Sequence, residues 1–420
     1  MQGLIQNNTL KKRLFAITLL ICMACSMVSW VFTDSETFTS AFFYDKTDTY
    51  MDFYNCLYYA RDVFEQGMPS IYPPLAHVIF YTVYRMLPAD LAAEGAHAVR
   101  DSQFGMTFMM LFSQGLCAVL CAIVFLVIRG DYGTRSLLAV ALALSAPWVF
   151  LLERGNLVAL TWVFISLYLL WYDSDNRFCR ELGLVSLAIA AGLKMYPAIL
   201  GLMLIHDRRW KEAIRCVIYG VLAFFLPMLL TPVGFGYISN MMLRYGETSA
   251  NLTNAGFSTK VNFNNVIRLT FAFGGKYGDT VASAASVLTW CLIILGILCF
   301  FLANKKWQAM VLLIIPMYSI PAFASRYVIV YLIVPLLLFL EDEQLRKIDW
   351  VYLLLFFGCF AMLTIGSANF FPDLLTARPV SFITALEAFS SFLLFLLVSL
   401  DVFYSCLKSS LKKRCGLTET

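Results

Sequence analysis

The chain has 420 residues, of which 60% are apolar and only 14% are charged, and its formal net charge is +4. A soluble globular domain carries about 25% charged residues, whereas the mean hydropathy of this chain is +0.75. The composition therefore excludes an ordinary soluble protein, and the basic clusters between apolar runs are explained by membrane topology rather than by nucleic-acid binding.

Apolar runs of near twenty residues recur along most of the sequence. Each is long enough to cross a hydrocarbon core of about 30 Å as a helix. The sequence therefore predicts an all-α polytopic membrane protein with about 11–13 transmembrane helices. The expected apolar spans are 14–32, 106–128, 136–152, 157–172, 182–193, 197–205, 213–231, 281–303, 307–320, 327–340, 350–366 and 380–404.

The first apolar run follows a basic cluster, Lys11–Arg13, and so has the order of charges of a signal peptide. The run from Leu14 to Phe32 is longer than a typical signal core, however, and no pair of small residues suitable for cleavage follows it. We therefore predict a retained first helix.

Most of the 31 Lys and Arg residues fall in loops on one side of the membrane if 106–128 runs inward. The positive-inside rule makes that side cytoplasmic, which predicts a multi-pass protein of the cell membrane with both termini in the cytoplasm. Residues 1–404 then form one transmembrane domain and 405–420 a basic cytoplasmic tail. Two large extracytoplasmic segments, 33–105 and 232–280, are the expected location of any chemistry.

The first of these segments contains an apolar stretch, Ile71–Pro88, whose two flanks must both lie outside. Pro73 and Pro74 at its start suit the first turn of a helix, so an interfacial or half-inserted helix is expected. The segment 232–280 is rich in Gly, Asn, Ser and Thr and is predicted to be loop with short helices.

Two carboxylates follow the first apolar run. Asp48 and Asp52 are four residues apart, which places them on one face if the segment is helical. Apolar and aromatic residues surround Asp52, and a carboxylate in such surroundings at the membrane surface is a candidate general base. A solvated acidic loop is the alternative.

Three cationic motifs are expected on the same side of the membrane. Arg154 lies in a turn with Glu153, Gly155 and Asn156, where a plain hairpin is the alternative to a functional charge next to apolar helices. Lys194 lies at the tip of a short helical hairpin, because the proline three residues later breaks a single helix.

A lysine at the tip of this hairpin suits an anion, most simply a phosphate. The alternative is that Lys194 is an ordinary loop lysine. Arg326 begins a span and can hold a phosphate or an acidic partner such as Asp52, unless it only anchors the helix at the interface. Lys260 and Arg268 in the second outer segment are weaker candidates of the same kind.

The sequence lacks the motifs of metal sites, nucleotide-binding loops and serine hydrolases. The three histidines are scattered and form no metal-binding spacing with cysteine, and no glycine-rich phosphate loop or serine elbow is present. We therefore expect no metal and no other cofactor. Most of the 12 cysteines lie in apolar spans, so no external disulfide framework is expected.

Carboxylates and cations around one outer-face cavity are what glycosyl transfer from a lipid-phosphate sugar requires: a base for the acceptor hydroxyl and positive charge for the departing phosphate. The rival hypothesis is a transporter or flippase of lipid-linked sugars without covalent chemistry. Transporters show internal repeats and broken helices at the bilayer midplane, and no repeat is visible here. A membrane scaffold leaves the two aspartates and Lys194 unexplained.

Four segments resemble, in the same order, the pattern of glycosyltransferase family 87. They are Asp52–Arg61, Ile71–Leu75, Glu153–Asn156 and Gly192–Pro197. The similarity covers roughly residues 10–345. The family commonly has Gly-Gln-x-Asn where this chain has Arg154, Gly155 and Asn156. The family pattern therefore does not assign a role to Arg154.

The resemblance implies a GT-C fold with interfacial helices in the first outer loop, and it places the family's general base on Asp52. It also implies a polyprenyl-phosphate sugar donor, most often mannose. The mechanism that we expect is an inverting transfer to a glycolipid or glycan acceptor, without a metal because a phosphate whose charge is neutralised is already a good leaving group. Lys194, Arg154 and Arg326 are the expected ligands of the donor phosphate. The expected substrate-binding residues are Asp48, Tyr72, Asn156, Tyr196, Asn265 and Arg268.

Overall fold

The computed structural model describes residues 2–32, 46–254, 260–273, 279–342, 346–364 and 380–414. Parts of the predicted outer segments and tail (33–45, 255–259, 274–278 and 415–420) and the end of the span expected at 350–366 lie outside the described residues. Within the described ranges all regular structure is helical, and an isolated β-bridge joins Lys260 to Ser325. The prediction of an all-α protein is confirmed.

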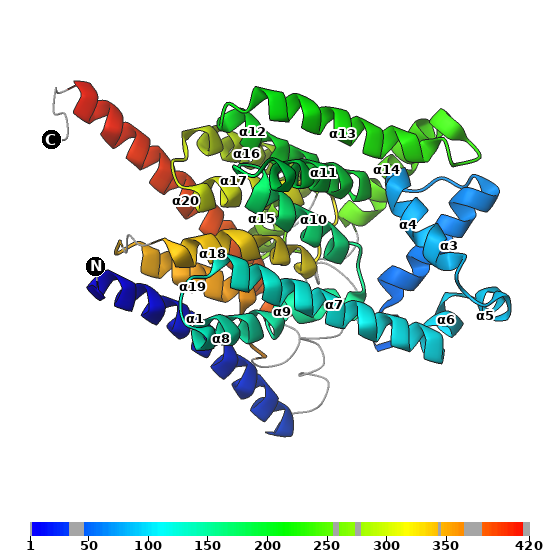
Figure 1. Ribbon diagram of the computed structural model, residues 1–420, viewed down its shortest axis with the longest axis horizontal. Helices are drawn as coiled ribbons and strands as arrows, with labels where there is room; N and C mark the ends of the chain where they lie inside the picture. The colour runs from blue at the N-terminus through cyan, green and yellow to red at the C-terminus, as the bar shows by residue number, and fades with distance from the viewer. Residues whose placement is uncertain are drawn as a thin grey trace.

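The first half of the chain forms helices of 6 to 31 residues (Figure 1). They are α1 (Gln2–Phe32), α3 (Met51–Gln66), α4 (Pro74–Tyr84), α5 (Ala89–Glu94), α6 (Ala96–Asp101), α7 (Gln103–Val127), α8 (Tyr132–Ala143), α9 (Ala146–Arg154), α10 (Val158–Trp171) and α11 (Arg177–Leu193).

The second half continues with a 3₁₀ segment, η2 (Tyr196–Gly201), that leads into α12 (Leu202–His206). A second one, η4 (Arg326–Leu332), leads into α18 (Ile333–Glu341). The remaining helices are α13 (Trp210–Met228), α14 (Tyr237–Asn254), α15 (Phe263–Phe273), α16 (Asp279–Leu302), α17 (Lys306–Ser319), α19 (Asp349–Phe360) and α20 (Phe382–Arg414).

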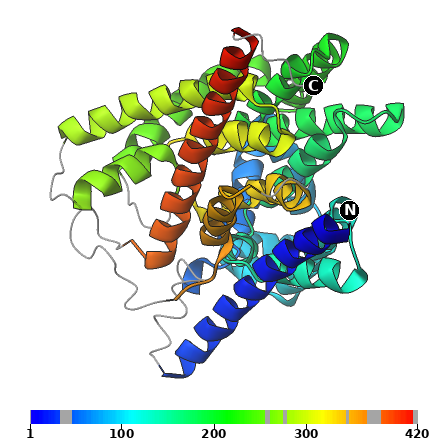
Figure 2. The same ribbon diagram turned by 90° about the vertical axis from the view of Figure 1, so that its left-hand side faces the viewer.

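Helix α17 forms the centre of the bundle. Every residue from Trp307 to Ser319 is buried, as expected of a helix that is apolar on all sides. It contacts α16, α18, α20 and the 3₁₀ segments η2 and η4, and α20 passes close to it (Figures 1 and 2). The peripheral helices expose apolar side chains such as Leu298 and Leu400, which suits a surface facing lipid.

Four described helices are long and apolar enough to cross a membrane, namely those over Asn8–Ser29, Gln103–Val127, Thr280–Leu302 and Phe382–Leu411. Helices α8 and α9, bent by 53° at their junction, make a fifth span if the pair is counted as one. The prediction of a polytopic membrane protein is confirmed. The count of 11–13 spans stays a prediction, because several expected spans form short or broken helices.

The stretch expected to lie at the interface forms α4, which begins with Pro74 at its first turn. Its 11 residues extend roughly 16 Å at about 1.5 Å per residue, too little to cross a core of about 30 Å. Helices α3, α4, α5 and α6 gather at one end of the molecule, on the right in Figure 1.

The second outer segment differs from expectation. Instead of short helices only, it contains α14, which is 18 residues long. Tyr237 and Met241, one turn apart, are buried on one side of this helix and pack with Val63 of α3 and Met228 of α13. Burial of that stripe stabilises a helix whose composition favours loop, because tertiary packing overrides intrinsic propensity.

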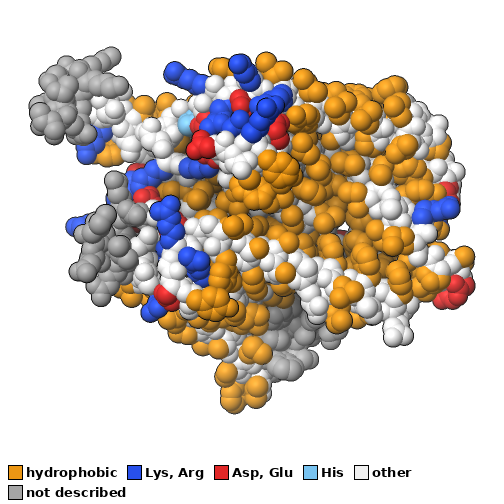
Figure 3. All heavy atoms as spheres, in the orientation of Figure 1, with side chains coloured by type: hydrophobic (Ala, Val, Ile, Leu, Met, Phe, Trp, Pro, Cys, Tyr) orange, Lys and Arg blue, Asp and Glu red, His pale blue; other side chains and the backbone are white. Residues whose placement is uncertain are grey.

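Basic side chains gather at the end of the molecule opposite α3–α6, around the N-terminal ends of α1 and α13 (Figure 3). Ion pairs join segments there, including Lys305 with Asp342 and Lys306 with Asp173, each at 2.6 Å. The start of α1 and the end of α20 lie on this same side (Figure 1). The arrangement has the asymmetry that the positive-inside rule describes, and its cytoplasmic assignment stays a prediction.

Candidate active site

The two aspartates of the first outer segment belong to different local structures. Helix α3 begins at Met51, whereas Asp48 ends a preceding 3₁₀ turn. Tyr50 between them has a φ of 61°, a left-handed conformation that costs a non-glycine residue on the order of 1–3 kcal/mol. The condition for one shared helical face is therefore not met, since this turn separates Asp48 from the helix that carries Asp52.

A backbone contact fixes the turn. The amide of Tyr50 donates to the carbonyl of Glu153 at 2.8 Å, which ties the start of α3 to the end of α9. Both aspartate side chains then reach the same arginine.

Arg154 bridges the two carboxylates. Its Nη1 donates to Asp48 Oδ2 at 2.6 Å, and its Nη2 forms a short ion pair with Asp52 Oδ1. Asn156 Nδ2 donates to the other oxygen of Asp52 at 2.6 Å. Arg154 is buried, so this pairing occurs with little solvent screening and fixes the orientation of Asp52.

The turn after α9 explains why the sequence reads Arg-Gly-Asn here. Gly155 ends the helix with a φ of 61°, and a Cβ at this position would lie 2.9 Å from Met109 Cε and 3.2 Å from Phe53 Cβ. Asn156 then accepts from the amide of Val158 at 3.0 Å through Oδ1, which stabilises the first turn of α10. Glycine is required for both the turn and the close approach of α3.

Asp52 lines a cavity of about 250 Å³, here called the carboxylate cavity. It is lined by Asp52, Asn55, Cys56, Tyr59, Tyr72, Phe150, Arg154, Asn156, Phe323, Ser325 and Tyr327. The sequence analysis missed Asn55, Cys56 and Tyr59. Their positions three, four and seven residues after Asp52 place them on the same face of α3, so helical spacing could have identified them.

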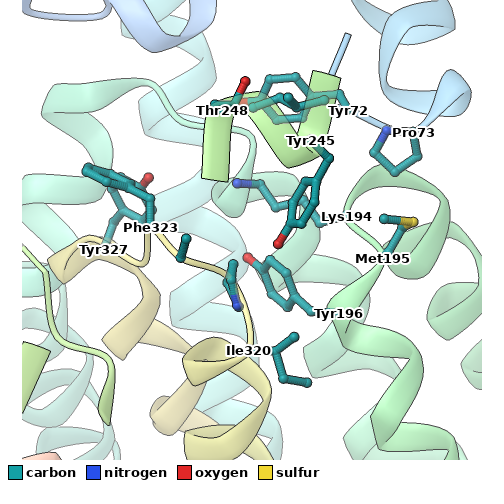
Figure 4. A pocket seen from close by; sticks show the side chains of 13 residues that line it. Tyr72, Pro73, Lys194, Met195, Tyr196, Tyr245, Thr248, Ile320, Phe323 and Tyr327 are labelled. Carbon is teal, nitrogen blue, oxygen red and sulfur yellow. The ribbon is translucent and has the colours of Figure 1, made fainter. Parts of the chain in front are cut away.

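A second cavity of about 400 Å³, the lysine cavity, lies beside the first. It is lined by Ile71, Tyr72, Pro73, Lys194, Met195, Tyr196, Tyr245, Thr248, Ile320, Pro321, Ala322, Phe323 and Tyr327. The two cavities share Tyr72, Phe323 and Tyr327, here called the shared wall. Figure 4 shows the Lys194 and Tyr196 side chains directed into the space that these residues surround.

Lys194 lies in the predicted turn, directly after α11 and before η2. Its ammonium nitrogen is 5.6 Å from the centre of the Tyr72 ring and forms no hydrogen bond or ion pair with the described residues. Burial lowers the pKa of Lys194 to about 8, against the opposing effects of Cys56 and Asp52. A partly buried cation without a counter-ion among the described residues, next to a mostly apolar cavity, suits an anion.

Two neutral donors complete the region between Asp52 and Lys194. Burial and the nearby Asp52 carboxylate raise the pKa of the Cys56 thiol to about 12. The pKa of Tyr72 is also raised, chiefly by Cys56, by burial and by Asp52. Both groups keep their protons at neutral pH, so the charged lining residues are Asp52 and Arg154 on one side of the shared wall and Lys194 on the other.

The remaining predicted residues lie elsewhere. Asn265 and Arg268 line a third cavity of about 390 Å³ together with Lys260, and it adjoins the lysine cavity through Tyr245 and the segment 320–322. The Asn265 amide donates to the carbonyl of Lys260 at 2.6 Å. Asn265 and Arg268 are therefore neighbours of the lysine cavity and do not meet Asp52.

Arg326 lines neither cavity and forms a buried pair with Glu387 of α20, with Nε donating to Oε2 at 2.7 Å and Nη2 to Oε1 at 3.2 Å. Its expected contact with the donor phosphate stays a prediction, as does that of Arg154. Among the described residues, no group of three or more His, Cys, Asp or Glu side chains is arranged to hold a metal ion.

A sequence model of glycosyltransferase family 87 matches residues 71–318, more than half of the chain. The matched range includes the Arg154 turn and Lys194, and it begins after Asp52. Neither a curated protein nor a solved structure shows significant similarity to this sequence.

Proposed function

The chain belongs to glycosyltransferase family 87 and is a membrane glycosyltransferase, and on this premise we propose that it transfers a sugar, in the first instance mannose, from a polyprenyl-phosphate donor to a hydroxyl of a glycolipid or glycan. The observation that carries the proposal is the pair of adjoining cavities, one with Asp52 and one with Lys194, on either side of a shared wall. The reaction takes place on the extracytoplasmic face, which is opposite the basic end of the molecule.

The lysine cavity suits the donor. Its lining is mostly apolar, and Lys194 is a cation with no counter-ion among the described residues. A polyprenyl-phosphate sugar combines an apolar chain with one anionic phosphodiester, so this cavity offers a complementary partner for each part. The sugar then extends past Tyr72 and Tyr327 toward Asp52.

The carboxylate cavity suits the acceptor. An ionised carboxylate has about four acceptor sites on two oxygens, so Asp52 can bind an acceptor hydroxyl while Arg154 and Asn156 hold its orientation. In the proposed step, Asp52 takes the hydroxyl proton and the acceptor oxygen forms a bond to the anomeric carbon. The bond from that carbon to the phosphate oxygen breaks, and the electron pair leaves with the phosphate.

The leaving phosphate gains one negative charge, which Lys194 neutralises in a site with little water. A single displacement inverts the configuration at the anomeric carbon. Arg154 positions the two aspartates in this mechanism, and Asp48 binds the sugar or the acceptor.

Purified protein incubated with a labelled polyprenyl-phosphate sugar and a panel of glycolipid acceptors tests the proposal directly. Transfer of label into a new covalent product supports it. In reconstituted vesicles, label that changes leaflet while remaining on its original lipid would instead identify a flippase.

Replacing Lys194 with Met is expected to raise the KM for the donor about 10- to 100-fold, because a hydrogen bond to a charged group contributes about 1.5–3 kcal/mol. The pH dependence provides a second readout. Since burial lowers the pKa of Lys194 to about 8, the ammonium is charged below that pH and neutral above it. The kcat/KM for the donor should therefore fall as pH rises through about 8.

Lys194→Arg is the matched control for this variant. A guanidinium stays charged throughout this range, so the alkaline fall should move to higher pH while donor binding is partly retained. An identical alkaline limb in the wild-type protein and the Arg variant would assign the limb to another group.

A further inference from the structure

A fourth cavity, of about 540 Å³, lies between α11, the η2–α12 segment and α13. All of its lining residues are apolar or glycine, and several are small, including Ala188, Ala191, Ala198 and Gly220. The small residues leave space between helices that otherwise pack closely. This cavity is here called the α11–α13 groove.

The groove adjoins the lysine cavity, because Met195 lines both. Met195 directly follows Lys194, and the two side chains point to opposite sides of the turn (Figure 4). Met195 thus lies between the anion-facing Lys194 and the groove, on the path that a long molecule bound at Lys194 would follow. Among the described residues, Lys194 is the one charged side chain that lines either cavity.

The groove also has a direction and a length. Its lining residues on α13 run from Ala213 to Phe225, roughly 18 Å at about 1.5 Å per residue, which is more than half of a hydrocarbon core of about 30 Å. At the outer end, a Cβ at Gly192 would lie 3.2 Å from the Ala223 carbonyl oxygen, so α11 touches α13 close to Lys194. The groove extends from there toward the basic end of the bundle.

We propose that the α11–α13 groove holds the isoprenoid chain of the donor whose phosphate lies at Lys194. The inference rests on the proposed function and adds the path of the chain. Bilayer lipid is as apolar as the groove, so burial alone gives the chain little preference for it. The anchored phosphate confines one chain to the groove, and the shape of the groove then selects that chain by packing.

Gly220→Phe tests the path. A Cβ at Gly220 would meet no heavy atom within 4 Å, so the new ring enters the groove rather than the protein. Gly115→Phe in α7 is the matched control, since a Cβ there also meets nothing within 4 Å and the residue lines none of the four cavities. Two donors are compared, undecaprenyl-phosphate mannose and the short-chain citronellyl-phosphate mannose.

The expected result is a rise of about tenfold in the KM of Gly220→Phe for the long-chain donor, the size of effect that overfilling a packed apolar site produces. The KM for the short-chain donor should change less than about twofold, and Gly115→Phe should leave both values unchanged. An equal rise for both donors, or no rise for either, overturns the groove assignment.

Native mass spectrometry with undecaprenyl phosphate separates this inference from the proposed function. Retention of the lipid by the wild-type protein and its loss in Gly220→Phe supports the groove even if no sugar is transferred. Equal retention in both proteins shows that the chain lies elsewhere, whether or not the enzyme is active.

Discussion

Replacing Asp52 with Asn is expected to reduce sugar transfer by about 10²- to 10⁴-fold, the range that a general base contributes, while the protein remains folded. The amide has the shape of the carboxylate, and its oxygen can still accept from Arg154 or Asn156. Asp48 continues to pair with Arg154. An amide cannot take up the proton of the acceptor hydroxyl, so the loss should appear in kcat, measured as the initial rate of labelled product.

Asp62→Asn is the control for this variant. Asp62 lies on the same helix, and its side chain is 28% exposed against 23% for Asp52. It pairs with Arg61 at 2.7 Å and lines neither cavity, so its replacement should leave the rate near that of the wild-type protein. If Asp52→Asn retained the rate of Asp62→Asn, Asp52 would not be the base.

The parts of the fold that follow from local pattern were predictable from the sequence. Composition established the membrane class, and charge placement alone indicated that Ile71–Pro88 does not span, in agreement with the short helix α4. The break at Pro197 predicted the turn that presents Lys194, and this turn lies between α11 and η2, where a second short helix was expected.

The partners of the charged residues were not predictable, because they depend on contacts between distant parts of the chain. Arg154 was expected at the phosphate, yet it reaches Asp48 and Asp52 only because Tyr50 adopts a left-handed backbone that no local signal indicates. Arg326 and Glu387 are 61 residues apart. No spacing rule joins an arginine in one helix to a carboxylate in another.

Replacing Glu387 with Leu is expected to destabilise the protein by about 3–5 kcal/mol, the cost of removing one partner of a buried ion pair. The Arg326 side chain is 2% exposed and that of Glu387 is 0% exposed, so water cannot replace the lost carboxylate. Thermal unfolding in detergent and the yield of folded protein measure the loss. Activity should also fall, because the pair holds the segment next to Tyr327 in the shared wall.

The double variant Arg326→Met with Glu387→Leu separates charge from packing. Two apolar side chains of similar volume often replace a buried pair at no loss or with a gain of about 1–4 kcal/mol, so the second substitution should recover most of the stability that the first removed. Phe150, whose ring centre lies 4.9 Å from the Arg326 guanidinium, can pack against the new Met. Recovery of both stability and transfer would show that Arg326 only holds the shared wall in place. Recovery of stability without transfer would support the role predicted from the sequence, in which Arg326 binds the donor phosphate.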